Sequence, residues 1–177
     1  EGAEHRGVYL RFGGETHRID FVEHTGRSIM LYAQHEVLKD LIALRLAAGD
    51  HILFGAKAIG LSGTSTSPAV HYTAGGGEHE LTCDFVAGCD GFHGVCRAAV
   101  PGKTFEKAYP FAWLGILAQV APSCHELIYA RHPNGFALHT MRSPTLTRLY
   151  LQCPLTDTVN DWPDDRVWKE LGTRLNM

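Results

Sequence analysis

The sequence lacks the features that mark proteins of membranes and nucleic acids. No apolar run approaches the length of a membrane-spanning helix, and no stretch resembles a signal peptide. There is no cluster of basic residues, and the formal net charge of −3 argues against nucleic acid and membrane surfaces as partners. The 177 residues, 45% hydrophobic and 20% charged, are typical of a globular chain that forms one domain or parts of two.

The cysteines and histidines also lack the spacing of a redox or metal motif. None of the five cysteines forms a C-x-x-C pair, and an odd number cannot pair completely. The eleven histidines include no H-x-x-x-H pair and no cluster with cysteine, so we expect no metal site. The cysteines are therefore expected to be reduced thiols in a cytoplasmic protein.

One glycine-rich motif is present, although the dinucleotide fingerprint G-x-G-x-x-G is absent. Gly88, Gly91 and Gly94 follow an apolar run at 85–87 that is typical of a strand. The pair Asp90-Gly91 predicts a tight turn, and the residues after it predict a short helix. A carboxylate in such a turn repels phosphate but accepts hydrogen bonds from ribose or ribityl hydroxyls. The alternative is an ordinary strand-to-helix turn.

Apolar residues alternate, or recur with helical spacing, along most of the chain, which predicts an α/β (α+β) fold class with a mixed sheet. Strands are predicted at 8–12, 19–21, 29–32, 52–59, 69–74, 79–87, 109–120, 126–131, 136–142 and 148–153, with hairpin turns at 13–14 and 132–135. A helix is predicted at about 35–48, where the apolar residues form one stripe. Another is predicted after Trp162, with Val167, Trp168 and Leu171 on one face.

Several segments resemble the single-component FAD-dependent aromatic hydroxylases, and within them the group that acts on 4-hydroxybenzoate. The resemblance is carried by 34–37, 88–94, Arg97, 109–111, 113–115, 125–130, 135–138, 142–143, Arg148 and 152–155. It covers essentially the whole chain and corresponds to the central portion of these enzymes. It implies a cytoplasmic flavoprotein monooxygenase of aromatic catabolism, an oxidoreductase that converts 4-hydroxybenzoate to 3,4-dihydroxybenzoate with FAD, NAD(P)H and O2.

The polar residues of three predicted strands suggest a binding site for a small acid. Thr140 and Arg142 are two apart in a strand and therefore face the same way. A guanidinium beside a hydroxyl suits a carboxylate, and Tyr129 and Tyr150 can add phenolic hydroxyls. The alternative is a solvent-exposed polar face. The resemblance implies that Arg142 pairs with the substrate carboxylate, assisted by Thr140 and Tyr150.

The resemblance also implies catalytic and cofactor-binding residues. Tyr129 would accept the phenolic proton of the substrate, because a phenolate ring is far more electron-rich toward an electrophilic oxygen. His5 would pass that proton to the surface, since histidine titrates near neutral pH; the alternative is an ordinary surface histidine near a terminus. Gln34 and Asp90 would lie near the flavin, and His93 would help to hold the nicotinamide cofactor.

Three regions are expected along the chain, because the strands of 7–32 and 109–153 are expected to share one sheet that the chain leaves and re-enters. The regions are 1–33 and 103–160 for a substrate-binding sheet, 34–102 for part of an FAD-binding domain, and 161–177 for a helix after the sheet. The chain begins at Glu1 rather than Met, and the family's G-x-G-x-x-G loop and later Gly-Asp motif are absent. We expect a fragment of an enzyme roughly twice as large, which alone neither holds FAD tightly nor hydroxylates.

Two other functions fit the same residues. One is a related FAD-dependent hydroxylase of another phenolic substrate, and the other is a non-catalytic module that binds aromatic acids. A homodimer is compatible with each of them. Thr140 and Cys96 stand where the family commonly has Ser, and His139 and Met141 also depart from the common pattern, so the preference among benzoates stays open.

Overall fold

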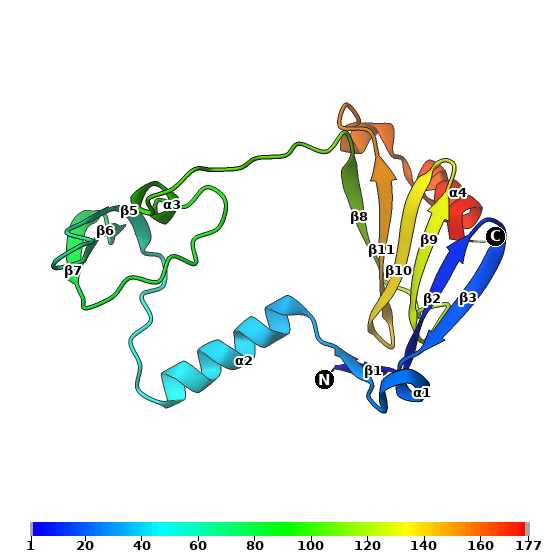
Figure 1. Ribbon diagram of the computed structural model, residues 1–177, viewed down its shortest axis with the longest axis horizontal. Helices are drawn as coiled ribbons and strands as arrows, with labels where there is room; N and C mark the ends of the chain where they lie inside the picture. Colours follow the sequence, from blue (N-terminus) through cyan, green and yellow to red (C-terminus); the bar gives the residue numbers. More distant parts are fainter. Residues whose placement is uncertain (1, 176–177) are drawn as a thin grey trace. The chain divides into compact units, whose positions relative to one another are not determined.

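A computed structural model describes residues 2–175, and the chain divides into two compact units (Figure 1). One unit comprises Glu1–Leu41 and Ala108–Met177, and the other comprises Ile42–Lys107. The boundaries expected from the sequence, at 33/34 and 102/103, lie a few residues earlier in the chain. A substrate-binding role for one region and a flavin-binding role for the other stay predictions.

The first unit is built on a six-stranded sheet with the strand order β3-β2-β9-β10-β11-β8. Its strands are β2 (Gly7–Phe12), β3 (Glu15–Asp20), β8 (Ala112–Ala118), β9 (Leu127–His132), β10 (Gly135–Ser143) and β11 (Leu146–Cys153). β2 and β9 run parallel, whereas the other neighbours are antiparallel. The predicted turns at 13–14 and 132–135 join β2 to β3 and β9 to β10. This mixed sheet confirms the predicted fold class.

Helix α4 (Asp164–Leu175) packs on one face of this sheet, next to β9 and β10, and a short 3-10 turn, η1 (Val159–Asp161), precedes it (Figure 1). The contact between helix and sheet forms the hydrophobic core of the unit. The buried core residues are Ala130, Ala137, Leu149, Leu151, Cys153, Trp162, Val167 and Leu171. The face of the sheet opposite α4 is therefore the one that is open for a ligand.

The sequence of α4 explains why it lies in this way. Asp164 and Asp165 stand in its first turn, where acidic side chains suit the helix dipole. Val167 and Leu171 are four residues apart, so they share the face that is buried against the sheet. Trp168, which was predicted on that face, is 50% exposed, because it lies about 100° round the helix from Val167. The prediction is wrong for this residue.

The third predicted strand of the N-terminal region does not join the large sheet. Strand β4 (Ile29–Leu31) pairs with β1 (Ala3–His5) in a separate two-stranded sheet. A short helix, α1 (Phe21–Thr25), redirects the chain before β4: Asp20 caps its start, and Gly26, with φ 71°, ends it. The strand before α1 also ends at Asp20, one residue earlier than predicted. The prediction that all strands of this region share one sheet is therefore wrong for β4.

The second unit contains a three-stranded antiparallel sheet and one short helix. Its elements are β5 (Lys57–Ser62), β6 (Ala69–Ala74), β7 (Gly77–Thr82) and α3 (Cys96–Ala99). The strand predicted at 52–59 begins only at Lys57, because Gly55 turns the chain with a φ of 70°. The short helix predicted after the Asp90 turn is present as α3.

The apolar run before the Asp90 turn is not a strand. The main-chain N–H of Cys83 donates to the carbonyl of Pro68 (2.9 Å), which stands just before β6 begins. Beyond this point β6 offers no further residue to pair with, so β7 ends at Thr82. Phe85 is 91% exposed within the described chain. The strand prediction for 79–87 is therefore wrong over its second half.

Helix α2 (Gln34–Ala47) contains the boundary between the two units and occupies the predicted helical region. The chain leaves it at Gly49, with a φ of 80°. None of its side chains is buried, and Leu38 and Leu44 are 51% and 65% exposed. The predicted apolar stripe is therefore not a buried face among residues 2–175. No helix in this part of the chain is both long and apolar enough to cross a membrane.

Candidate functional site

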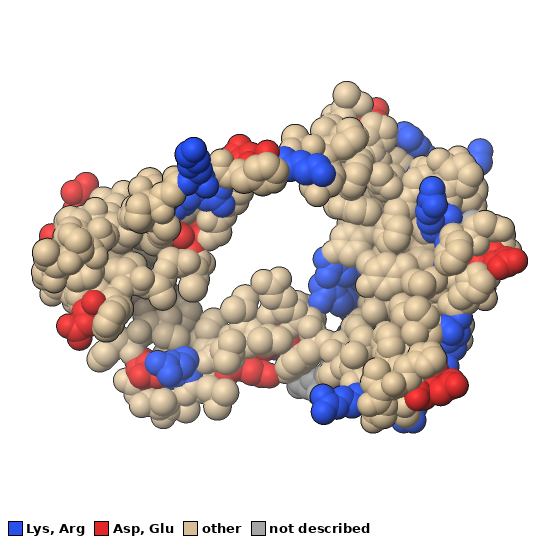
Figure 2. Space-filling view, in the orientation of Figure 1, with Lys and Arg blue, Asp and Glu red and all other residues tan. Residues whose placement is uncertain are grey.

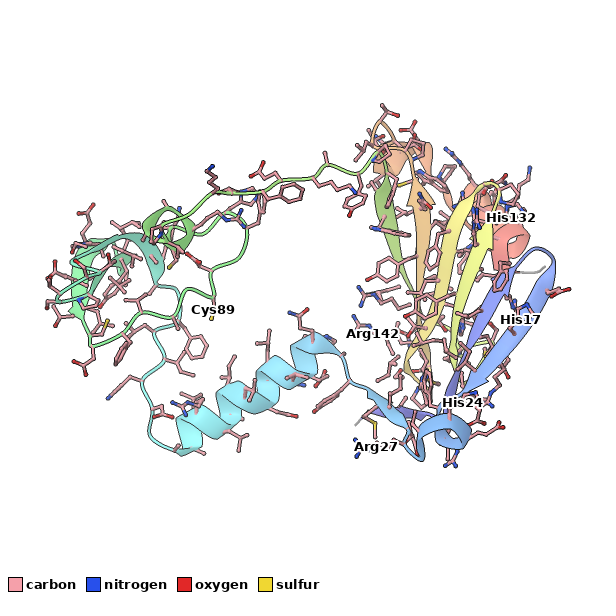
Figure 3. The ribbon with its side chains drawn as sticks, viewed as in Figure 1. His17, His24, Arg27, Cys89, His132 and Arg142 are labelled. Atoms are coloured by element: carbon pink, nitrogen blue, oxygen red, sulfur yellow. The ribbon has the colours of Figure 1, made fainter. Side chains whose placement is uncertain are left out.

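A pocket of about 380 Å³ lies in the first unit, on the sheet face opposite α4. Its walls come from the β4–α2 junction and from β9, β10 and β11, and they consist of Leu31, Tyr32, Ala33, Gln34, Leu127, Tyr129, Leu138, Thr140, Met141, Arg142, Arg148 and Tyr150. Figure 3 shows Arg142 extending from the sheet on the side away from α4. The structure thus brings five of the predicted site residues to one pocket, whereas their individual roles stay predictions.

The register of the strands explains how these side chains meet. Leu138 pairs with Tyr129 on one side and with Tyr150 on the other, so the three side chains form a row across β9, β10 and β11. Thr140 pairs with Arg148 in the adjacent row. Residues of paired positions face the same side of a sheet, and so do residues two apart on one strand. Both tyrosines, the threonine and an arginine therefore converge on one face.

The pocket contains two guanidinium groups and no carboxylate. Neither Arg142 nor Arg148 forms an ion pair with an acidic side chain of residues 2–175, and no acidic residue lines the pocket. Figure 2 shows basic side chains at the place where Figure 3 labels Arg142. Burial and the nearby charge of Arg142 lower the pKa of Arg148, whose guanidinium lies 4.5 Å from the ring centre of Tyr150. The pocket therefore holds excess positive charge, which suits an anion.

Arg148 was not among the predicted site residues. The signal that could have found it is its position two residues before Tyr150, which places both side chains on the same face of one strand. The alternation of β11 bears this out, because Leu149 and Leu151, which alternate with Arg148 and Tyr150, are buried in the core.

Thr140 is 7% exposed, and its hydroxyl donates to the carbonyl of Met141 over 3.4 Å. A bulge shifts the register between Met141 and Ser143, so the simple alternation that related Thr140 to Arg142 does not continue through this point. Both side chains nevertheless line the pocket. The alternative of a solvent-exposed polar face is therefore wrong for Thr140.

His5, the last residue of β1, is completely buried next to Leu127 at the start of β9. Its Nδ1 accepts a hydrogen bond from the main-chain N–H of Leu127 (3.3 Å), so the neutral ring carries its proton on Nε2. Nε2 has no partner among residues 2–175. Burial lowers the pKa of His5, and the nearby charge of Glu126 opposes this shift. The surface-histidine alternative is therefore wrong, and a proton route through His5 stays a prediction.

The glycine motif of the second unit is explained by the packing of Asp90. The Asp90 carboxylate accepts a hydrogen bond from the main-chain N–H of Cys96 (3.0 Å), and this bond, together with one from the Cys96 thiol, lowers the pKa of Asp90. A Cβ on Gly94 would lie 2.0 Å from that carboxylate, and a Cβ on Gly88 would lie 2.6 Å from the Cys96 Cβ. Gly91 adopts a φ of 74°. The glycines therefore let the turn close on an ionised carboxylate.

An open cleft of about 920 Å³ adjoins this turn. Asp90, Gly88 and Gly91 line it, together with residues of the loop before β6 and of the segment after α3. His93 is exposed next to the turn, with its ring edge-on to Phe92 at 4.9 Å, and it does not line the cleft. Asp90 and His93 belong to one unit and Gln34 to the other.

Comparison with known proteins identifies the family. The family model described as an FAD binding domain matches residues 1–177. The chain belongs to this FAD-binding domain family. It is 44% identical to p-hydroxybenzoate hydroxylase of Acinetobacter baylyi (strain ATCC 33305 / BD413 / ADP1), over 99% of this chain and 45% of that protein. The chain thus spans about half the length of this relative, and the resemblance to the aromatic hydroxylases is confirmed.

Solved structures of flavoproteins share the fold. p-Nitrophenol 4-monooxygenase PnpA from Pseudomonas putida DLL-E4 is 18% identical, with a TM-score of 0.81 over 98% of this chain and 46% of that one. The flavin-dependent halogenase CmlS is 10% identical, with a TM-score of 0.78 over 98% of this chain and 34% of that one. At these identities the likeness concerns the fold alone.

FAD is the cofactor that the FAD-binding domain family implies, and residues of the second unit fit part of it. The ionised Asp90 carboxylate has lone pairs beyond the one that Cys96 uses, so it can accept a hydrogen bond from a sugar or ribityl hydroxyl. The adjoining cleft is in the size range of small-molecule sites. Gln34 offers an amide group in the pocket of the first unit. That Gln34, Asp90 and His93 hold the cofactors stays a prediction.

A second buried histidine lies on the core face of the same sheet. His139 is 2% exposed, and neither of its ring nitrogens has a hydrogen-bond partner among residues 2–175. Burial is the main cause that lowers the pKa of His139, and the main chain at Glu126 and at His139 itself partly opposes this shift. This residue was seen in the sequence only as a departure from the family pattern. It has no place in the pocket, because it points to the opposite face.

The two buried histidines predict that this member of the FAD-binding domain family loses stability in mild acid. Their pKa values are lowered in the folded chain, so the unfolded chain binds more protons once the pH falls below the ordinary histidine pKa of about 6.5. Stability is therefore complete above that pH and falls below it, by up to about 1.4 kcal/mol per pH unit for each histidine. His139→Met is expected to flatten this dependence, as measured by urea midpoints at several pH values.

The control for this experiment is His24→Gln, because His24 is an exposed residue of α1 (Figure 3). It should leave the pH dependence of the urea midpoint as it is in the unchanged chain. A urea midpoint that falls equally steeply below about pH 6.5 with and without His139 would contradict a contribution of His139 to the acid sensitivity.

Proposed function

We propose that the chain forms the substrate-binding wall and part of the flavin site of an FAD-dependent monooxygenase. The reaction proposed is the conversion of 4-hydroxybenzoate to 3,4-dihydroxybenzoate with NAD(P)H and O2. The observation that carries this proposal is the pair of guanidinium groups, without a carboxylate partner among the described residues, in a pocket that also contains two tyrosines. The likeness to p-hydroxybenzoate hydroxylase supports the same reaction.

The cationic end of the pocket suits the carboxylate of the substrate. Arg142 can form two parallel charge-assisted hydrogen bonds with a carboxylate. The hydroxyls of Thr140 and Tyr150 lie on the same wall and can donate further hydrogen bonds. Arg148 adds a second positive charge, and its contact with the Tyr150 ring holds it there. A bound carboxylate would remove the mutual repulsion of the two guanidinium groups.

The other end of the pocket suits the phenol. Tyr129 lies on β9, next to the strand that carries Thr140. Leu138 lies between Tyr129 and Tyr150 in the register and provides an apolar floor for the ring of the substrate. FAD, when bound, supplies the electrophilic oxygen derived from O2. Tyr129 would hydrogen-bond to the substrate's phenolic oxygen, stabilise the phenolate and so make the ring more reactive at the adjacent carbon. His5 is proposed as a later carrier of the proton that the phenol releases: it would take up a proton at Nδ1, in place of the hydrogen bond from Leu127, and release one from Nε2, which has no partner among residues 2–175.

The charge of the ligand provides the direct test of this proposal. The flavin-loaded protein should bind 4-hydroxybenzoate at least tenfold more tightly than 4-hydroxybenzamide, which has the same shape without the charge, because hydrogen bonds to charged groups are worth roughly 1.5–3 kcal/mol. Equilibrium titration by fluorescence or calorimetry measures both dissociation constants. Equal affinities would overturn the proposal and favour a hydroxylase of neutral phenols.

A further inference from the structure

Among residues 2–175, the side chain of Tyr129 contacts another aromatic ring and forms no hydrogen bond. Its hydroxyl has no hydrogen-bond partner among the described residues, and the side chain is 40% exposed. The ring of Phe136 lies 6.0 Å from the Tyr129 ring, centre to centre, at an interplanar angle of 51°. Phe136 pairs with Arg131, two residues beyond Tyr129 on β9, so the two rings are diagonal neighbours on one face of the sheet.

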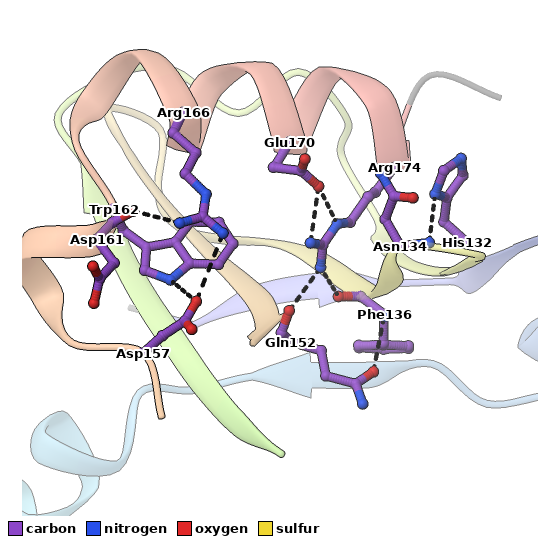
Figure 4. Close-up of polar contacts among 10 residues, drawn as sticks. All are labelled: His132, Asn134, Phe136, Gln152, Asp157, Asp161, Trp162, Arg166, Glu170 and Arg174. Carbon is purple, nitrogen blue, oxygen red and sulfur yellow. Dashed lines mark hydrogen bonds and ion pairs between the residues drawn. The ribbon is translucent and has the colours of Figure 1, made fainter. Parts of the chain in front are cut away.

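Phe136 is itself fixed by its main chain. Its N–H donates to the side-chain oxygen of Gln152 (2.9 Å), and its carbonyl accepts from Nη1 of Arg174 (3.3 Å; Figure 4). Arg174 is 4% exposed and is tied to Glu170 on α4 and to the carbonyl of Gln152 (2.8 Å). The main chain of Phe136 is therefore held at both its N–H and its carbonyl.

The ring of Phe136 is fixed as well. The ring of Trp113, on the edge strand β8, lies 5.4 Å from it in an edge-to-face arrangement at 84°. Trp113 and Tyr129 thus contact Phe136 from β8 and from β9. Edge-to-face aromatic pairs have a preferred geometry, so such a contact restricts the rotation of both rings.

We propose that Phe136 is a positioning residue that holds the ring of Tyr129 at the phenol end of the pocket. This inference rests on the proposed function, because it takes the Tyr129 hydroxyl as the group that meets the substrate's phenol. The clamp by Gln152 and Arg174 fixes the main chain of Phe136, and Phe136 limits where the Tyr129 ring can swing. A hydroxyl without a partner in the described chain can then meet a ligand at a small entropic cost.

The inference predicts that Phe136 affects recognition of the phenol but not of the carboxylate. Benzoate and 4-hydroxybenzoate share the carboxylate, and only the latter has a phenol for Tyr129 to meet. In the flavin-loaded protein, Phe136→Leu should reduce the preference for 4-hydroxybenzoate over benzoate by roughly two- to tenfold. The affinity for benzoate should stay nearly unchanged. Phe136→Tyr keeps the ring and should restore the preference.

A second measurement follows the ionisation of the bound phenol by its absorbance. If Tyr129 stabilises the phenolate, Phe136→Leu should move the ionisation of bound 4-hydroxybenzoate to higher pH than in the unchanged protein. Trp168→Leu is the control, because Trp168 is a half-exposed aromatic residue of α4 outside the pocket. It should change neither the preference nor the ionisation. Circular dichroism verifies that each variant is folded.

The outcomes separate this inference from the proposed function. If Phe136→Leu weakens both acids equally, or leaves both the preference and the ionisation unchanged, the positioning role is overturned while the proposed function stands. If the unchanged protein binds neither acid, or does not prefer the phenolic one, the proposed function fails and the inference fails with it.

Discussion

Replacing Arg142 by glutamine is expected to weaken the binding of 4-hydroxybenzoate by roughly a hundredfold in the flavin-loaded protein. No carboxylate of the described residues lines the pocket, so the Arg142 guanidinium can bind one from a ligand. Glutamine keeps a hydrogen-bond donor and much of the length but removes the charge and the paired N–H geometry. Truncating one partner of a desolvated charge pair costs 2 kcal/mol or more, because the other charge is left without its counterpart.

The remaining guanidinium of Arg148 limits this loss. It lines the same pocket and keeps some attraction for an anion, so the variant should still bind weakly, with a smaller dependence on salt because one positive charge is gone. Removal of the Arg142 charge should also relieve the repulsion that lowers the pKa of Arg148. Equilibrium titration at two salt concentrations measures the residual affinity and its salt dependence.

Arg27→Gln provides the matched control for the Arg142 variant. Arg27 is exposed, and it lies outside the pocket (Figure 3). Its replacement should leave the dissociation constant unchanged. A loss of less than about fivefold for Arg142→Gln, the size typical of an exposed ion pair, would contradict a role in holding the carboxylate.

Replacing Arg174 by methionine is expected to destabilise the first unit by about 3–5 kcal/mol. The guanidinium is 4% exposed, and its Nε and Nη2 each contact Glu170 over 2.9 Å. It also donates to the carbonyls of Phe136 and Gln152. These bonds join α4 to the start of β10 and the end of β11 (Figure 4). Methionine fills a similar length but leaves the Glu170 carboxylate and both carbonyls without this donor.

Urea unfolding measures this loss, with the fluorescence of the buried Trp162 in the core as one probe. Lys169→Met is the control, since Lys169 is an exposed residue of the same helix, and its effect should stay within about 0.5 kcal/mol. The double variant Arg174→Met with Glu170→Gln should recover part of the loss, because it no longer leaves an unpaired carboxylate. A change below about 1 kcal/mol for Arg174→Met alone would show that the pair is not important for the fold.

Local sequence patterns predicted most of the elements of the fold. The turn at 132–135 and the alternation of β11 are local signals, and both are present. The strand expected at 85–87 failed for a non-local reason, since an apolar run becomes a strand only if a neighbouring strand is left to pair with it. Pairing of β4 with β1 instead of the large sheet depends on the direction that α1 and Gly26 give the chain. Such a direction is not encoded in the periodicity of the strand itself.

The candidate site could be predicted in part because its residues recur at a spacing of two along neighbouring strands. The register of β10 and β11, which the hairpin position largely determines, brings Thr140 and Tyr150 to the same face. Arg148 has the same spacing of two from Tyr150, but the lack of a described carboxylate around it, which gives it its importance, is not visible in any local pattern. The burial of His5 and His139 was missed for a similar reason, since histidine is common both at surfaces and in cores.

The recognition of a carboxylate by Arg142 is tested most directly by a cycle of two proteins and two ligands. The proteins are the full-length flavin-loaded enzyme that contains this chain, unchanged and with Arg142→Gln, and the ligands are 4-hydroxybenzoate and 4-hydroxybenzamide. If the guanidinium meets the carboxylate, removing either charge should weaken binding strongly, and removing both should cost little more than removing one. Two losses that simply multiply would mean that Arg142 and the carboxylate do not meet, and would contradict the proposed site.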